Sequence, residues 1–203
     1  MKTLKFIILT LAIASMSFSR LDSTLTEAER NYAVGLLQST RENLLKKIAN
    51  LTPEQLNFKA DPSHWSIAEC VEHIAIAENN FTGFIQTSLK EPADPSKRAE
   101  IKMSDDNIVK MITDRTNKVK TSEMFQPSGK FGSFEATLNE FKTKRANSIT
   151  YVKTTSDDLR NHYNDFPFGK IDTYQTILFM AGHSKRHTEQ IEEIISNPNF
   201  PKK

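Results

Sequence analysis

Apolar residues recur along this chain at intervals of three, four or seven positions, the spacing that gathers them on one face of an α-helix. The first series follows Thr26-x-x-Glu29, a capping box in which two side chains bond to the free amide groups of a helix's first turn. Its apolar positions are Leu37, Leu44, Ile48 and Leu51. We therefore expect a first long helix that begins at Thr26.

Further caps predict the later elements. Thr52-Pro-Glu-Gln55 indicates one short helical turn before the break at Pro62. Ser66-x-x-Glu69 begins a second long helix that should end near Leu89, with Trp65 placed to pack over Cys70. The other expected helices run from Ser104 to the Pro127–Gly129 region, from about Ser133 past Val152, and from Asp172 to about Ser196.

Two of these later helices show clear apolar stripes. The stripe of the third long helix is Ile108, Met111, Ile112 and Val119. The stripe of the fourth is Phe134, Leu138, Phe141, Ile149 and Val152.

No segment shows a competing strand pattern. The stretch from Asp157 to Lys170 is expected to be a loop, and the aromatic rings of its Phe166-Pro-Phe-Gly169 segment should cover one end of the molecule. Four to five amphipathic helices joined by loops predict an all-α fold, an antiparallel four-helix bundle with an extra short helical turn and loops.

The first residues have the order of parts of a signal peptide. Lys2 and Lys5 precede the apolar run 6–14, and Ser17 and Ser19 suit a cleavage site. The run is too short for a membrane span, which needs roughly 20 apolar residues. We therefore expect residues 1–19 to be removed and 20–203 to form one exported domain, periplasmic or secreted, with no stable membrane span after cleavage.

Composition supports one domain and argues against a nucleic-acid partner. The 203 residues are 37% hydrophobic and include only six glycines, enough for one core. Loss of Lys2 and Lys5 would leave 25 basic residues against 25 acidic ones, so the formal charge falls from +2 to zero. Cys70 is the single cysteine and cannot form a disulfide within the chain.

Three of the five histidines fall beside apolar stripes of predicted helices. His183 and His187 are four residues apart, so they lie on one helix face, in register with Met180 and Ile191. His73 is flanked in the same way by Cys70, Ala77, Phe81 and Phe84. Buried imidazoles need partners for their nitrogen lone pairs, and a divalent cation is one such partner. The alternative is a set of core histidines that only bond to neighbouring groups.

The remaining polar candidates have simpler interpretations. Glu69 could orient His73 but already serves as a cap, and Cys70 suits a small buried apolar position. Arg186 and Gln190 could contact a bound anion or belong to a solvated helix face. His64 and His162 fall in predicted loops, where exposure is expected.

Three segments together resemble the DinB-like superfamily: Trp65-Ser-Ile-Ala-Glu-Cys-Val-Glu-His73, Gly169-Lys-Ile-Asp-Thr-Tyr-Gln175 and His183-Ser-Lys-Arg-His187-Thr-Glu-Gln-Ile191. The resemblance runs from about Thr26 to Ser196. It implies a four-helix bundle in which His73, His183 and His187 bind one metal ion. Three histidines with a position left for water are typical of a catalytic site, whereas structural zinc sites usually have four protein ligands.

The resemblance implies two reaction classes, metal-assisted hydrolysis and transfer of a small thiol. Export would place the protein away from the thiols of the reducing cytosol, which favours hydrolysis. Two other interpretations stay open: a non-catalytic protein that binds a metal or small ligand, and a purely structural bundle. Imidazole ligands suit zinc, nickel, iron and copper alike, and a bundle of this size often forms a homodimer. No nucleophile elbow, P-loop or dinucleotide motif occurs, and the small-molecule substrate is not indicated.

Overall fold

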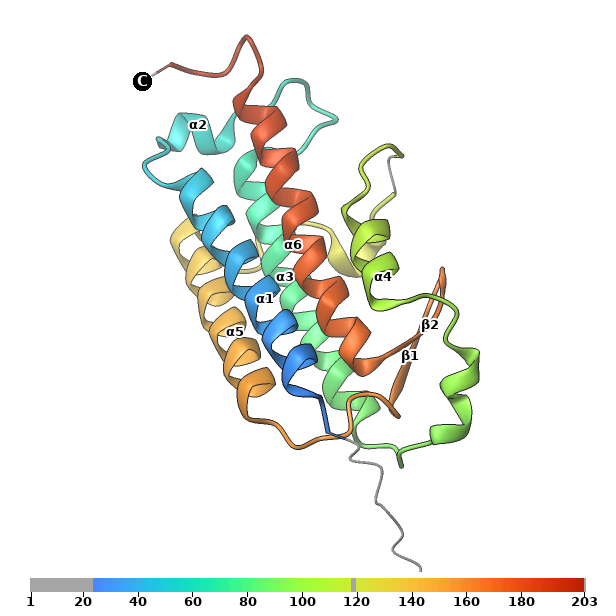
Figure 1. Ribbon diagram of the computed structural model, residues 1–203. Helices are drawn as coiled ribbons and strands as arrows, with labels where there is room; N and C mark the ends of the chain where they lie inside the picture. Colours follow the sequence, from blue (N-terminus) through green and yellow to red (C-terminus); the bar gives the residue numbers. More distant parts are fainter. Residues whose placement is uncertain (1–23, 118–119, 203) are drawn as a thin grey trace, which may run out of the picture.

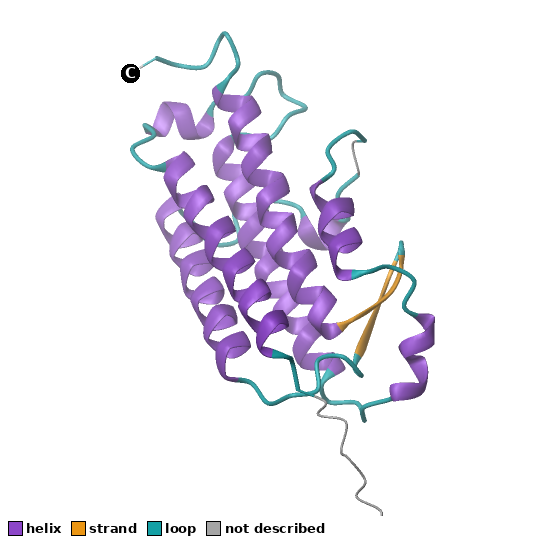
Figure 2. Ribbon diagram, in the orientation of Figure 1, coloured by secondary structure: helices purple, strands orange, loops and turns teal. Residues whose placement is uncertain are grey.

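The computed structural model describes residues 24–117 and 120–202. Its four long helices form a bundle (Figures 1 and 2), which confirms the predicted all-α fold class. The elements are α1 (Glu27–Ile48), α2 (Pro53–Asn57), α3 (Ile67–Ser88), η1 (Pro95–Glu100), α4 (Asp105–Thr113), η2 (Glu123–Phe125), α5 (Phe134–Thr154), β1 (Tyr163–Phe166), β2 (Gly169–Asp172) and α6 (Thr173–Ile195). The expected signal peptide, residues 1–19, lies outside the described residues.

Side-chain caps fix the helix starts at the predicted positions. Complete capping boxes precede α1, α2, α3 and α6, at Thr26, Thr52, Ser66 and Asp172. Ser104 and Ser133 cap α4 and α5 through their hydroxyl groups. Each cap gives a hydrogen-bond acceptor to an amide group that the helix itself leaves unpaired, so the start is decided by a few adjacent residues.

The bundle combines parallel and antiparallel neighbours. The packed pairs are α1–α6, α3–α6, α3–α5 and α1–α5, so α1 lies diagonally from α3 and α5 lies diagonally from α6. The Tyr174 hydroxyl donates to the Glu29 carbonyl, which joins the starts of α6 and α1 and makes this pair parallel. Ser88 and Thr173 join the end of α3 to the start of α6, and that pair is antiparallel. The antiparallel α3–α6 pair is the one that carries the site.

Two helices end earlier than their apolar stripes predict. α4 ends at Thr113 because the Asp114 carboxylate accepts a hydrogen bond from the Thr116 backbone amide at 2.8 Å, a local turn that competes with the helix. Val119, assigned to this helix from the sequence, lies outside the described residues. α1 ends at Ile48, and Asn50 has a positive φ of 61°, so Leu51 lies beyond the helix although it still packs against the core.

A short hairpin occupies the segment expected to be a loop. β1 and β2 pair antiparallel in the register Tyr163↔Asp172 and Phe166↔Gly169. The prediction of no strand was therefore wrong, because four-residue strands are too short to show a two-residue alternation. Gly169, with φ +125°, permits the tight turn. Phe166 and Phe168 stack toward Phe179, so the aromatics cover the side of α6 near its start.

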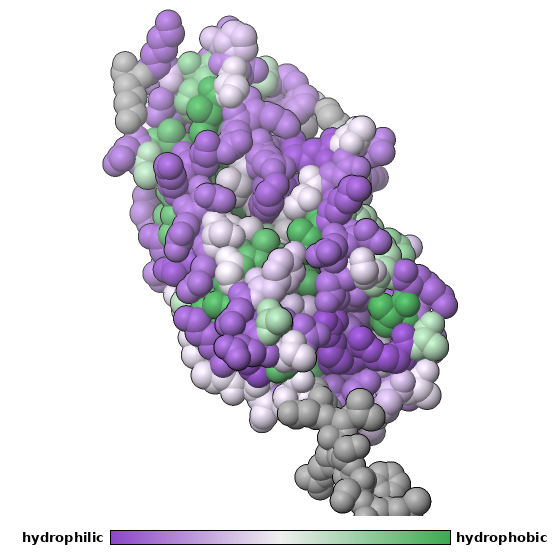
Figure 3. All heavy atoms as spheres, in the orientation of Figure 1, coloured by the Kyte–Doolittle hydropathy of each residue, from purple (hydrophilic) through white to green (hydrophobic). Residues whose placement is uncertain are grey.

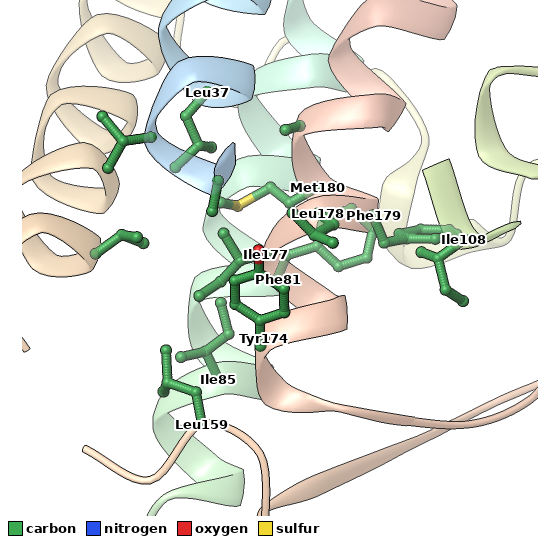
Figure 4. Close-up of a cluster of buried hydrophobic side chains, with 14 of the residues drawn as sticks. Leu37, Phe81, Ile85, Ile108, Leu159, Tyr174, Ile177, Leu178, Phe179 and Met180 are labelled. Carbon is green, nitrogen blue, oxygen red and sulfur yellow. The ribbon is translucent and has the colours of Figure 1, made fainter. Parts of the chain in front are cut away.

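The core consists of two apolar clusters. The larger brings together side chains from α1, α3, α4 and α6, among them Leu37, Phe81, Ile108 and Tyr174 (Figure 4). The smaller includes Leu44, Ile74, Phe141 and Ile191, toward the end of the bundle at which α6 stops. The face drawn in Figure 3 is mainly hydrophilic with scattered apolar residues. None of the described helices combines the length and hydropathy needed to cross a bilayer.

A buried polar layer separates the two clusters. Both Glu78 carboxylate oxygens accept hydrogen bonds from Arg145, each at 2.8 Å, and both side chains are fully buried. Arg145 also donates to the Thr40 hydroxyl at 2.8 Å and to the Ser184 hydroxyl at 2.7 Å. The four residues come from α3, α5, α1 and α6, so one ion pair contacts every helix of the bundle.

Candidate metal centre

Three imidazoles converge where the first turns of α3 lie beside the middle of α6. The Nε2 atom of His73 is 3.0 Å from the Nε2 atoms of both His183 and His187. One ligand atom from each ring lies within 4.8 Å of the others. His73 and His187 are 3% and 8% exposed, and His183 is partly buried. The structure thus brings together the three histidines that the sequence singled out.

Hydrogen bonds at the far side of two rings orient their Nε2 atoms. Nδ1 of His73 lies 2.7 Å from the Phe125 carbonyl oxygen, which can only accept, so in the neutral ring Nδ1 carries the proton. Nδ1 of His187 lies 2.9 Å from the Gln190 Oε1 atom and donates in the same way. Both Nε2 atoms are then unprotonated, and their lone pairs face one another across 3.0 Å.

The environment holds the three rings neutral. Burial lowers the pKa of His187 to about 3, and the neighbouring His73 adds to the effect. Burial lowers the pKa of His183 well below its ordinary value, with further contributions from His187 and His73. Burial also lowers the pKa of His73, although the bond to the Phe125 carbonyl acts in the opposite direction. A proton is therefore a poor partner for these lone pairs near neutral pH.

The indole ring of Trp65 covers one side of the cluster. Its centroid lies 4.8 Å from that of His73 and 6.1 Å from that of His187. Trp65 also packs against the apolar cluster that contains Cys70, as its position before α3 predicts. Its proximity to the histidines was not inferred from the sequence, because the α3–α6 contact is not local.

A groove of about 580 Å³ opens beside His187. Trp65, His64 and Gln190 line it, together with Arg115, Arg186 and Glu193. Arg115 follows the end of α4, in a stretch that the sequence assigned to a longer helix, so nothing in the pattern marked it as a site residue. The cluster is therefore adjacent to a solvent-connected space with titratable groups on its walls.

The other candidates lie in several environments. Glu69 caps α3 and pairs with Lys59, and the pKa of the buried Cys70 thiol is raised to about 12, chiefly by desolvation. His64 is half-exposed and pairs with Asp61. The expectation of an exposed His162 was wrong: its ring is partly buried, because the residue, directly before β1, lies against the end of α3, where Nδ1 is 2.9 Å from the Ser88 carbonyl oxygen.

Comparisons with known proteins agree with this architecture. The family model of the DinB superfamily matches residues 36–191, a span that includes all three clustered histidines. "Uncharacterized protein YuaE" of Bacillus subtilis (strain 168) is 25% identical over 162 residues, which cover 79% of this chain and 96% of that protein.

A similar solved structure is described as "YfiT from Bacillus subtilis is a probable metal-dependent hydrolase with an unusual four-helix bundle topology". It is 16% identical, with a TM-score of 0.50, and the match covers 85% of this chain and 89% of that one. At this identity the likeness concerns the fold.

Proposed function

This chain belongs to the DinB superfamily, and we propose that it binds one divalent metal ion through His73, His183 and His187 and acts as a metal-dependent hydrolase. The observation that carries the proposal is the approach of the unprotonated Nε2 atoms of His73 and His187 to 3.0 Å in a buried cluster of neutral imidazoles, with the Nε2 atom of His183 also 3.0 Å from that of His73. Lone pairs at this distance repel one another unless a cation lies between them, and imidazole nitrogens bind such an ion at about 2.1 Å.

Two features favour catalysis over metal storage. Among the residues that the structure describes, no fourth histidine, cysteine or carboxylate joins the cluster. Three protein ligands are typical of catalytic zinc sites, which leave one coordination position for water or substrate, whereas structural sites have four. The groove beside His187 has room for a small molecule. His73, His183 and His187 would hold the divalent ion, and its Lewis acidity would supply a nucleophile from water near neutral pH. The description of YfiT as a probable metal-dependent hydrolase agrees with this reaction class.

The chain's own residues would hold and orient the site. Phe125 and Gln190 fix the rings of His73 and His187 through their Nδ1 atoms, and this support typically raises metal affinity. Trp65 shields one side from water. We assign His64 the role of proton acceptor, because it lines the groove outside the cluster and its Nδ1 is paired with Asp61, which leaves Nε2 free to take up a proton.

The proposal includes export. Lys2, Lys5 and the apolar run 6–14 support removal of residues 1–19, so the enzyme would act outside the cytoplasm. Mass spectrometry of the protein from its native source tests this step. A mature chain that begins near Arg20 is expected, and a retained Met1 on a cytosolic product would contradict export.

The hydrolase proposal is tested with protein purified without an affinity tag. Elemental analysis should find about one divalent metal ion per chain. The metal-loaded protein should hydrolyse members of a panel of chromogenic esters and amides. The rate should fall when a chelator removes the metal and recover when the metal is restored. His64→Gln should keep the metal and lose about a hundredfold in turnover. Metal bound at full occupancy with no hydrolysis of any panel member would favour a binding protein instead.

A further inference from the structure

The groove beside His187 carries more positive than negative charge. Arg115, Arg186 and Glu193 are the charged residues among those that line it. Two guanidinium groups thus face one carboxylate. A divalent ion on three neutral imidazoles would add two positive charges next to the same groove, so the excess of positive charge grows once the proposed metal is bound.

Arg186 is held in place without a carboxylate partner. Its guanidinium donates to the backbone carbonyl of Asp114 and, at 3.1 Å, to that of Asn117. None of the ion pairs formed within the described residues includes Arg186. Carbonyl groups orient the side chain but do not neutralise its charge, and the nearby carboxylates of Asp114, Glu189 and Glu193 form no ion pair with it. Arg186 therefore keeps its positive charge at the wall of the groove.

Arg115 has a partner that can be exchanged. Its Nε and Nη2 atoms donate to the two carboxylate oxygens of Glu193 at 3.1 and 2.5 Å. The Arg115 side chain is 22% exposed and that of Glu193 is 65% exposed, so the carboxylate can swing into solvent while the guanidinium stays. These two parallel hydrogen bonds show that the Arg115 guanidinium can bind a carboxylate in the groove.

We propose that the groove binds a small molecule that carries a carboxylate, which Arg186 and Arg115 hold while the reacting group lies at the histidine cluster. This inference rests on the proposed function, because the metal supplies part of the charge excess. A planar carboxylate can accept two parallel hydrogen bonds from one guanidinium group. Its single negative charge also balances the one positive charge that remains when Glu193 is subtracted from Arg115 and Arg186. Trp65 offers an apolar surface for the rest of the molecule.

Two matched probes test the charge requirement. Benzohydroxamate and 4-carboxybenzohydroxamate share one metal-binding group and differ by one carboxylate. We would measure their dissociation constants with zinc-loaded protein by calorimetry, after confirming one zinc per chain. The carboxylated probe should bind about tenfold more tightly than the neutral one, as expected for charge-assisted hydrogen bonds in a partly buried groove.

Variants with opposite effects separate the groove from general electrostatics. Arg186→Gln should remove the preference for the carboxylated probe, whereas Glu193→Gln should increase it, because the competing carboxylate is gone. Lys185→Gln is the control, because Lys185 is adjacent in sequence, pairs with Glu189 and does not line the groove. It removes one positive charge and should leave the dissociation constants of both probes unchanged. Zinc content and circular dichroism are checked for each variant.

Equal affinity of the wild-type protein for the two probes would overturn the carboxylate inference and leave the metal site intact. The same holds if Lys185→Gln weakens binding of the carboxylated probe as much as Arg186→Gln does. If neither probe binds while zinc stays in place, the open position required by the proposed function is wrong, and the inference fails with it.

Discussion

At the scale of single residues, the site depends on which nitrogen of each ring carries a proton. The Phe125 carbonyl takes the Nδ1 proton of His73, and Gln190 takes that of His187, so two Nε2 atoms are left to face each other. Burial opposes adding a proton to any of the three rings. The same groups therefore make the cluster receptive to a metal ion and unfavourable for an imidazolium.

The depressed pKa values predict how stability changes with pH. In the unfolded chain these histidines titrate at their ordinary pKa of about 6.5, whereas in the folded protein the pKa of His187 is about 3. The unfolded state therefore binds more protons as the pH falls below about 6.5, and the free energy of unfolding of the metal-free protein should decrease between about pH 6.5 and 3. Thermal melts across this range measure it, and His187→Asn should make the dependence shallower.

Bound metal should follow the same protons. Imidazole coordinates only when it is neutral, and burial lowers the pKa of all three rings in the folded protein, that of His187 to about 3. The ion should therefore stay bound at pH 6 and leave only as the pH approaches 3, and its loss should lower the melting temperature. Equilibrium dialysis at pH 7.5, 6, 4.5 and 3 followed by elemental analysis measures occupancy. An ion that stays fully bound below about pH 3 would rule out the histidine ligands.

At the scale of elements, the sequence predicts those features that depend only on residues close together in the chain. The helix starts at Thr26, Ser66 and Asp172 follow from caps that span three residues, and the i, i+4 spacing of His183 and His187 is equally local. The meeting of His73 with that pair spans 110 residues and came from the family resemblance. The groove arginine Arg115 was missed, because its place depends on how α4 packs against α6.

Gly182 sets the approach of α4 to the helix that carries the site. A Cβ atom at this position would lie 2.5 Å from the Cγ2 atom of Ile112, so Gly182→Ala should force the two helices apart. We expect a loss of about 1–3 kcal/mol in the free energy of unfolding, as for an overpacked core, measured by urea denaturation. Ile112→Ala in the same chain should recover part of this loss.

Gly35 offers the matched control on α1. A Cβ atom there meets nothing within 4 Å, so Gly35→Ala should stabilise the protein by up to about 1 kcal/mol through helix propensity alone. If Gly182→Ala were as neutral or stabilising as Gly35→Ala, the close contact between α4 and α6 would not exist in solution.

At the scale of the whole molecule, the buried layer of Arg145, Glu78, Thr40 and Ser184 ties the four helices together at one level. Ser184 is adjacent to His183, so the layer also helps to fix the position of α6 along its axis relative to α3. Nothing in the sequence distinguishes Arg145 from the many charged residues of solvated helix faces. Its role follows from a bundle order in which α5 packs between α1 and α3 and lies diagonally from α6.

Arg145→Met should destabilise the protein by about 3–5 kcal/mol, because it leaves the Glu78 carboxylate buried without a counter-charge. The double variant Arg145→Met/Glu78→Leu removes both charges and should be more stable than the single variant. Lys144→Met, at a partly exposed neighbouring position whose ion pair with Glu140 lies at the surface, is the control and should change stability by less than about 1 kcal/mol. A double variant no more stable than Arg145→Met would show that the unpaired charge is not the cause.

The central claim is that His73, from one helix, and His183 and His187, from another, hold the same ion. The most direct test is bound metal per chain at neutral pH in the five single histidine-to-alanine variants, each first shown by circular dichroism to be folded. Replacing His73, His183 or His187 should remove most of the bound metal, since each loses a ligand of one shared ion, while His64→Ala and His162→Ala should retain it. Wild-type metal content in His73→Ala, with loss in His187→Ala, would contradict the three-histidine site.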